Sequence, residues 1–282
     1  MLSYRHGFHA GNHADVLKHV VLVQLLKHLT RKDNALWVID THAGAGGYSL
    51  EAGYAARNAE FANGIGRLWS RQGLPAPVRD YVQQVRAVNP DGVLRSYPGS
   101  PQIALQMLRP QDRLRCFELH STESKVLQAH FRAAGRRVAV VAGDGFAGLK
   151  SVLPPPSRRG LVLIDPSYEV KEHYRDVQTA MRDALQRFAT GTYAVWYPLL
   201  QRREAASLPQ ELQRLAPGDW LRVSLAIMAP AADGFGMHGS GMFILNPPWL
   251  LHGVLREVMP YLVKVLGQDG EGSFVLEYDE NA

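Results

Sequence analysis

Five short apolar segments, each bounded by polar residues, glycine or proline, constrain the fold of this chain more than any other feature. They cover residues 36–40, 115–119, 138–141, 161–164 and 193–197, and stretches with helical apolar spacing lie outside them, the first at 14–29. Strands that are apolar on both faces and alternate with helices are typical of a parallel sheet covered on both sides. The pattern therefore predicts an α/β fold with a mostly parallel sheet.

Two further regions modify this simple alternation. Residues 221–228 and 241–245 read as strands joined by a loop rich in glycine and proline, which predicts antiparallel strands at one edge. Residues 50–98 exceed what a β-α-β unit of about 30 residues needs, and they show helical periodicity. We interpret 50–98 as a small helical insertion within a single domain that comprises residues 1–282.

Composition excludes several classes of protein. The 282 residues are 46% hydrophobic, which is typical of a globular chain. The apolar runs are far shorter than the ~18 residues of a membrane span, and the first residues lack a signal-peptide pattern. A single cysteine permits no internal disulfide, so we expect a cytoplasmic protein. The net charge of +5 suits an anionic partner and a solvated basic surface about equally.

A glycine loop at 40–47 follows the first strand, and we expect a helix after it. The loop lacks the lysine of a phosphate-binding loop, and Ser49 stands where the dinucleotide fingerprint has its third small residue. Glu118 ends the second strand, and Asp144 and Gly145 follow the third. An acid in each place could bind ribose hydroxyls and an adenine edge. Each acid alone is more simply a helix cap or turn, but together they predict an S-adenosylmethionine site.

The fourth strand ends in Asp165-Pro166-Ser167-Tyr168, which resembles the [DNS]-P-P-[YFW] motif of methyltransferases that act on exocyclic amines. Such an amine is a poor nucleophile because its lone pair is delocalised into the ring. The Asp165 carboxylate and the Pro166 carbonyl could accept its two N–H groups, and Asp165 could later take the proton. We expect Tyr168 to stack on the flipped base. Ser167 replaces a second proline and removes a fixed φ from the loop.

A second match, Asn246-Pro247-Pro248-Trp249, follows the motif more literally. It comes after an edge strand, whereas the catalytic motif must lie at the carboxyl end of a strand close to the glycine loop. We therefore prefer Asp165. We expect Asn246 to end a strand and Trp249 to pack against the protein.

The N-terminal stretch 4–19 contains four histidines, but no cysteine or carboxylate cluster completes a metal site, and we expect no metal. We interpret this stretch as a recognition segment. Tyr4 offers a stacking ring, while His6 and Lys18 offer donors to phosphate or base. The simpler alternative is an ordinary capped helix.

Several motifs together resemble the RlmJ family of bacterial 23S ribosomal RNA adenine-N6 methyltransferases. They are Y-R-H-x-F-H-A-G-N-H-A-D-V-L-K-H at 4–19, D-T-H-A-G-A-G at 40–46, Y-P-G-S-P at 97–101, D-P-S-Y-E at 165–169 and G-M-x-I-x-N-P-P-W at 241–249. The resemblance implies a Rossmann-like class I S-adenosylmethionine-dependent methyltransferase fold with a helical insertion. It implies Asp165 as proton acceptor and Tyr4 as an RNA contact. It implies cofactor contacts at His19, His42, Ser100, Glu118, Asp144, Gly145 and Asp165.

The resemblance and the residues lead to one expected activity, methyl transfer from S-adenosylmethionine to N6 of a specific adenine in 23S rRNA. We expect a monomer that acts on naked or partly assembled RNA, because the target base must be flipped into the pocket. Two alternatives remain open. One is a DNA adenine-N6 methyltransferase with a similar motif, and the other is a DNA-uptake accessory protein without catalysis.

Overall fold

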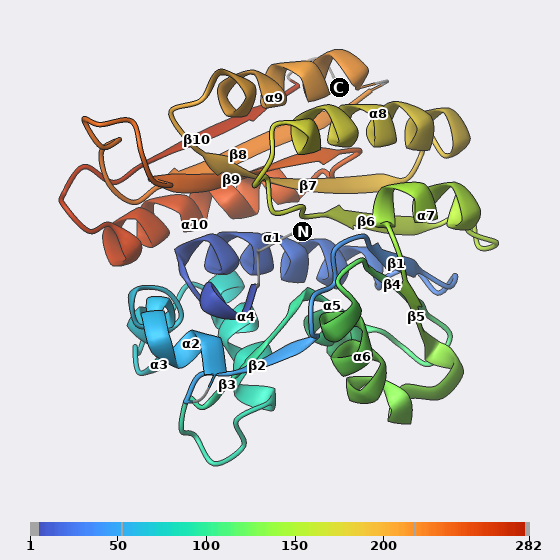
Figure 1. Cartoon of the computed structure of the whole chain (residues 1–282), viewed down its shortest axis with the longest axis horizontal. Coiled ribbons are helices and arrows are strands. Elements are labelled where there is room, and N and C mark those ends of the chain that lie inside the picture. Colours follow the sequence, from blue (N-terminus) through green and yellow to red (C-terminus); the bar gives the residue numbers. More distant parts are fainter. Residues whose placement is uncertain (1–5, 52, 217, 280–282) are drawn as a thin grey trace.

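An eight-stranded sheet forms the centre of the molecule in a computed structural model that describes residues 6–51, 53–216 and 218–279. Its strand order is β10-β8-β9-β7-β6-β1-β4-β5 (Figure 1). Five strands are parallel: β1 (Trp37–Asp40), β4 (Arg113–Glu118), β5 (Val138–Ala142), β6 (Gly160–Ile164) and β7 (Thr192–Leu199). Three antiparallel strands complete it: β8 (Trp220–Ala226), β9 (Gly239–Leu245) and β10 (Ser273–Tyr278). The predicted parallel sheet with antiparallel edge strands is confirmed, while β10, which is mostly exposed, was not predicted.

Register brings the functional ends of the parallel strands together. Strand β1 lies between β4 and β6, with Asp40 opposite Cys116 on one side and Leu163 on the other. Because all three strands run in the same direction, their carboxyl ends meet at one edge of the sheet. The residues that follow them therefore share this edge.

Helices cover both faces of the sheet (Figure 1). One face carries α7 (Gly145–Val152), α8 (Glu172–Arg187) and α9 (Arg203–Leu215). The other face carries α1 (His13–Leu29), α5 (Ser100–Met107), α6 (Ser121–His130) and α10 (Leu251–Leu266), with a short turn, η3 (Arg132–Arg137), after α6. Each face has its own buried cluster. Within the described ranges, none of the helices has the length and apolar character needed to cross a bilayer.

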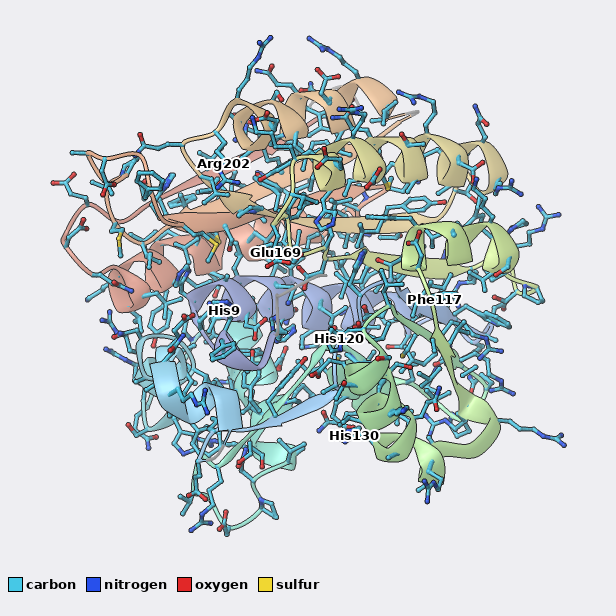
Figure 2. All side chains as sticks on the ribbon, viewed as in Figure 1. His9, Phe117, His120, His130, Glu169 and Arg202 are labelled. Atoms are coloured by element: carbon cyan, nitrogen blue, oxygen red, sulfur yellow. The ribbon has the colours of Figure 1, made fainter. Side chains whose placement is uncertain are left out.

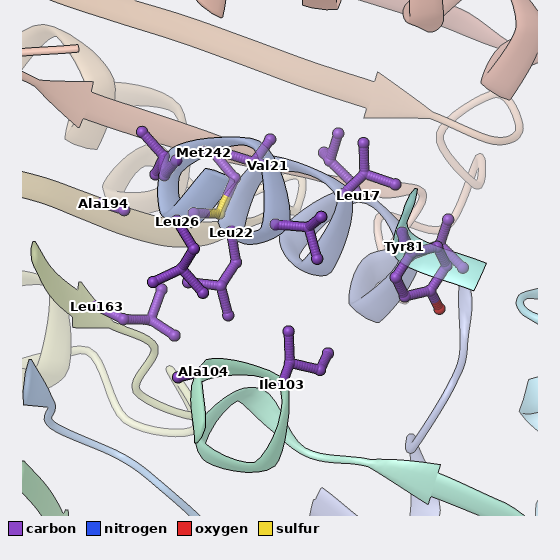
Figure 3. Packing of buried hydrophobic residues seen from close by; sticks show 14 of the residues in the cluster. Leu17, Val21, Leu22, Leu26, Tyr81, Ile103, Ala104, Leu163, Ala194 and Met242 are labelled. Atoms are coloured by element: carbon purple, nitrogen blue, oxygen red, sulfur yellow. The ribbon is translucent and has the colours of Figure 1, made fainter. Parts of the chain in front are cut away.

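Helix α1 is buried along almost its whole length, because it is apolar around most of its circumference. The Asn12 side chain caps it by accepting hydrogen bonds from the backbone N–H groups of Ala14 and Asp15. Figure 3 shows its Leu and Val side chains between α5 and the sheet. The labelled residues of this contact are Leu17, Val21, Leu22, Leu26, Ile103, Ala104, Leu163, Ala194 and Met242.

The segment 50–98 is mostly helical and shares the core of α1, through residues such as Ile65 and Tyr81. It contains α2 (Gly53–Asn58), η2 (Glu60–Asn63), α3 (Gly66–Trp69) and α4 (Ala76–Ala87), and α2 lies against the N-terminal turn η1 (His6–Phe8). A two-stranded antiparallel ribbon, β2 (Gly47–Ser49) and β3 (Ser96–Pro98), joins it to the rest. The expected helix directly after the glycine loop is therefore wrong. The loop leads into a strand because its residues pair with the returning chain.

Strand β9 is antiparallel to β7, with Leu245 opposite Tyr193 near the start of β7. Its carboxyl end consequently lies at the edge of the sheet opposite the glycine loop. There Asn246 adopts a left-handed φ of 51°, and its Nδ2 donates to the carbonyls of Ala189 (2.8 Å) and Gly191 (2.6 Å). Asn246 thus ends a strand, as predicted. Trp249 is 80% exposed, so the prediction that it packs against the protein is wrong.

We expect Asn246→Ala to lower the free energy of unfolding by about 2 kcal/mol, because it removes two hydrogen bonds and puts alanine at a left-handed φ. Urea denaturation of the two proteins measures this difference. Equal stability of variant and wild type would contradict the structural role of Asn246.

Candidate active site

A cavity opens where the carboxyl ends of β1, β4, β5 and β6 meet. It brings together nine residues selected from the sequence: His6, Lys18, His42, Ser100, Glu118, Asp144, Gly145, Asp165 and Pro166. The other lining residues are Thr41, Ala43, Gly44, Tyr48, Gly99, Leu119, His120, Glu123, Phe146, Ser167, His173 and Asp176. In Figure 2, His120 and Glu169, which follow β4 and β6, lie near the centre of the view.

The glycine loop and Glu118 form one wall. The Glu118 carboxylate accepts hydrogen bonds from the backbone N–H groups of Gly44 (2.8 Å) and His120 (2.7 Å), and burial raises the pKa of this carboxyl. Gly44 has a left-handed φ of 59°, and a Cβ there would lie 2.2 Å from the Tyr48 hydroxyl. Only glycine fits this position without a shift, so the backbone itself can line the cavity.

The residues after β5 form a second wall. Asp144 caps α7, since its Oδ1 accepts from Phe146 N at 2.9 Å, and it also lines the cavity. A Cβ on Gly145 would lie 2.0 Å from the Thr41 carbonyl oxygen, which again requires glycine. The rings of His42 and Phe146 meet edge to face, 4.9 Å apart between centroids. Together they give the cavity an aromatic side beside a carboxylate.

Ser100 lies at the start of α5, and its hydroxyl donates to Asp40 Oδ2 at 2.6 Å. Burial raises the pKa of Asp40 to about 6, although the Ser100 hydrogen bond favours its charged form. Burial lowers the pKa of His42 to about 3, so this ring is neutral near pH 7. Because the Ser100 hydroxyl donates a hydrogen bond to Asp40, its oxygen is free to accept a hydrogen bond from a ligand.

Asp165 is held by a buried ion pair. The Lys18 ammonium is 2.5 Å from Asp165 Oδ2 and 2.8 Å from Asp15 Oδ1, and Lys18 is 4% exposed. Asp15 also accepts from His6 (3.0 Å) and from Gly11 N (2.8 Å). Burial raises the pKa of Asp165, and Lys18 offsets this effect only in part. A carboxylate with a raised pKa is a better proton acceptor.

Lys18 consequently does not form the predicted contact to RNA. Its ammonium is enclosed between two carboxylates, and its long side chain spans the distance from α1 to the end of β6. His6, by contrast, remains partly exposed at the cavity, with 20% of its side chain accessible. Tyr4 lies outside the described residues.

Two other predicted residues do not reach the cavity. Tyr168 has a left-handed φ of 51°, is 2% exposed, and donates its hydroxyl to the Trp196 carbonyl at 2.7 Å. The structure thus contradicts the expected stacking of Tyr168 on a base. His19 is fully buried with its Nδ1 2.7 Å from the Tyr97 hydroxyl, and it does not line the cavity. In this structure His19 lies behind the cavity wall, and its implied cofactor contact stays a prediction.

Some lining residues were missed by the sequence analysis. His173 and Asp176 stand three positions apart in α8, on the same side of the helix, and Glu123 belongs to the first turn of α6. Helical spacing is the only signal that these residues carry, and it does not show which helix end faces the cavity. Among the described residues, no group of histidine, cysteine and carboxylate side chains could hold a metal ion.

Comparison with known proteins assigns the family. A family profile described as "Ribosomal RNA large subunit methyltransferase D, RlmJ" matches residues 33–279. Two curated proteins named "Ribosomal RNA large subunit methyltransferase J" are similar over nearly their whole length. The one from Haemophilus influenzae is 43% identical over 279 residues (99% of each chain), and the one from Escherichia coli is 44% identical over 272 residues (96% of each). This chain belongs to the RlmJ family.

A solved structure shares the fold of this chain. The crystal structure of a Legionella pneumophila protein superposes with a TM-score of 0.88 at 36% identity, covering 96% of this chain and 99% of that one. The family profile and the two curated proteins confirm the resemblance to the RlmJ family. The chain is a methyltransferase whose methyl donor is S-adenosylmethionine.

The cavity of this RlmJ family member fits that donor. Glu118 presents a carboxylate that can accept hydrogen bonds from ribose hydroxyls. The adjacent backbone at Gly44 can approach the ligand closely because Gly44 has no side chain. Asp144, Gly145 and Phe146 provide a polar group and a flat ring where an adenine would lie. The chemistry of the lining thus matches a nucleoside with a positively charged sulfur.

We expect Ser100→Ala to lower stability by about 1–2 kcal/mol at about pH 8 and by less at about pH 5. The pKa of Asp40 is about 6 in the folded protein and 3.8 in the unfolded reference. Protonation of Asp40 therefore stabilises the fold as the pH falls through 6. Above pH 6 the buried Asp40 carboxylate is charged, and the hydrogen bond from Ser100 stabilises that charge. Urea denaturation at both pH values measures the effect. An equal loss of stability at about pH 8 and about pH 5 would contradict the coupling between Ser100 and Asp40. In an Asp40→Asn background, the loss caused by Ser100→Ala should not vary with pH.

Proposed function

We propose that this chain transfers a methyl group from S-adenosylmethionine to N6 of an adenine in 23S ribosomal RNA. The observation that carries the proposal is the Asp165-Pro166 pair at the end of β6, in the same cavity as Glu118 and the glycine loop. The curated relatives, named as ribosomal RNA large subunit methyltransferases, support RNA as the substrate. We further propose a monomeric, cytoplasmic enzyme that acts on naked or partly assembled RNA.

The reaction needs an acceptor for the protons of a weakly nucleophilic amine. Bound S-adenosylmethionine supplies a methyl group activated by a positively charged sulfur. Lys18 occupies Asp165 Oδ2, which leaves Oδ1 to accept one N–H of the adenine amine. The Pro166 carbonyl would accept the other N–H. These two acceptors favour the developing positive charge on nitrogen, and Asp165 then takes the proton.

The ion pair with Lys18 orients this acceptor. Both side chains are at least 88% buried, so the carboxylate cannot rotate freely into solvent. Asp15, which is held in turn by His6 and Gly11, fixes the ammonium from the other side. A preorganised carboxylate reduces the reorganisation that the transition state requires.

Recognition of RNA would come from the N-terminal side of the cavity. His6 keeps part of its surface accessible there and links the segment to Asp15. We propose Tyr4, which precedes it, as the aromatic contact to the RNA. The Tyr168 ring does not serve this purpose, because it is part of the core below the catalytic loop.

Mass mapping of 23S rRNA from cells with and without the protein tests the proposed function. We expect one adenine to lose a single methyl group in its absence, and purified enzyme to restore that group with labelled S-adenosylmethionine. Labelling of DNA and not rRNA would support a DNA adenine methyltransferase instead. Full rRNA methylation in cells lacking the protein, with no transfer in vitro, would support a role without catalysis.

We expect Asp165→Ala to lower the rate of methyl transfer to 23S rRNA by roughly a thousandfold, because it removes the acceptor of the amine proton. Asn246→Ala is the matched control, since it alters the same motif pattern at the opposite edge of the sheet. At a temperature where both variants are folded, the control should keep most of the wild-type rate. Loss of activity in the Asn246→Ala control, with the rate of Asp165→Ala unchanged, would contradict the assignment of catalysis to the Asp165 motif.

A further inference from the structure

A second hollow lies at the edge of the sheet opposite the active site. It forms where β8 begins and where β9 and β10 end. Its lining residues are mostly aromatic side chains, prolines and acids: Asp219, Trp220, Leu221, Pro247, Pro248, Trp249, His252, Tyr278 and Asp279. The motif-like segment 246–249, which has no place in the catalytic cavity, supplies one wall of this hollow.

Trp249 is displayed there on a fixed turn. The residue is 80% exposed, although exposing a large aromatic surface to water is unfavourable. Two prolines precede it, Asn246 is anchored to two carbonyls, and Leu251 N donates to the Pro248 carbonyl at 2.8 Å. The backbone on both sides of the indole is therefore held in place. Such a ring loses little conformational freedom when a ligand binds.

A second ring faces the hollow from β10. Tyr278 is 40% exposed and lies against His252, with ring centroids 3.9 Å apart. His252 follows Trp249 closely in the chain, at the start of α10. The hollow thus offers flat faces of two exposed aromatic residues that originate from separate elements.

The charge of the hollow is opposite to that of the whole chain. Asp219 and Asp279 line it, and no lysine or arginine among the described residues does, whereas the chain has 31 basic and 26 acidic residues. Backbone hydrogen bonds hold both acids at strand ends, from Asn246 N to Asp219 O and from Asp279 N to Trp220 O. The carboxylate of Asp219 disfavours RNA phosphates here and favours a cation.

We propose that this hollow binds the side chain of an arginine presented by a basic segment of a partner protein. A guanidinium is planar, stacks on aromatic faces and forms two parallel hydrogen bonds with a carboxylate, whereas a lysine ammonium does not stack in this way. The exposed Trp249 indole and the Asp219 carboxylate supply both kinds of contact. The site is independent of the methyl-transfer chemistry, because it lies at the other end of the strands.

Fluorescence anisotropy of a fluorescein-labelled peptide of alternating glycine and arginine, titrated with the full chain, tests the proposal. We expect saturable binding that Trp249→Ala weakens by roughly tenfold. Asp219→Asn should weaken it several-fold, and a peptide with citrulline in place of arginine should not bind. Phe235→Ala is the matched control, because Phe235 is 77% exposed on the loop between β8 and β9 at the opposite edge. This control should bind as the wild type does.

Three results would overturn the proposal. The first is equal binding of the peptide by Trp249→Ala and wild type, and the second is equal binding of the citrulline peptide. The third is a single-stranded RNA oligonucleotide that competes for the site and itself depends on Trp249, which would make the hollow a nucleic-acid site. Thermal melting of Trp249→Ala verifies folding, which a highly exposed side chain should not affect.

Discussion

A buried ion pair between Lys18 and Asp165 joins the two parts of the chain on which the active site depends. The two residues are 147 positions apart, one in helix α1 and the other after strand β6, and their charged atoms are 2.5 Å apart. Removing one partner would leave an uncompensated charge in the protein interior, which typically costs 3–5 kcal/mol. The almost complete burial of α1 is what keeps the ammonium at this position.

The chain contains two copies of a similar tetrapeptide pattern, and strand direction separates their roles. Asp165 follows a parallel strand, so it lies in the same cavity as Glu118 and the glycine loop. Asn246 follows β9, which runs the opposite way, so the same pattern comes out at the far edge. There its amide ends a strand and its tryptophan faces solvent. Residue type alone does not distinguish a catalytic loop from a structural turn, because the chemistry depends on which groups lie nearby.

Residues that follow a strand directly were predictable, whereas residues that depend on a distant partner were not. Glu118, Asp144 and Asp165 were found because apolar strands are visible in the sequence and their carboxyl ends meet. Lys18 looked like a surface donor because no local pattern reveals a carboxylate that lies 147 positions away. Tyr168 was misassigned because a left-handed φ turns its ring into the core, and no sequence pattern indicated that φ.

The sequence by itself determined the alternation of strands and helices, the glycine positions and the chemical types available at the strand ends. These follow from local properties, namely apolar periodicity and the absence of a side chain where backbone must come close. Only the tertiary structure decided which charged groups pair, which rings are covered and which motif faces the cofactor cavity. Those outcomes depend on burial and on distances between residues far apart in the chain, and such distances exist only once the sheet has formed.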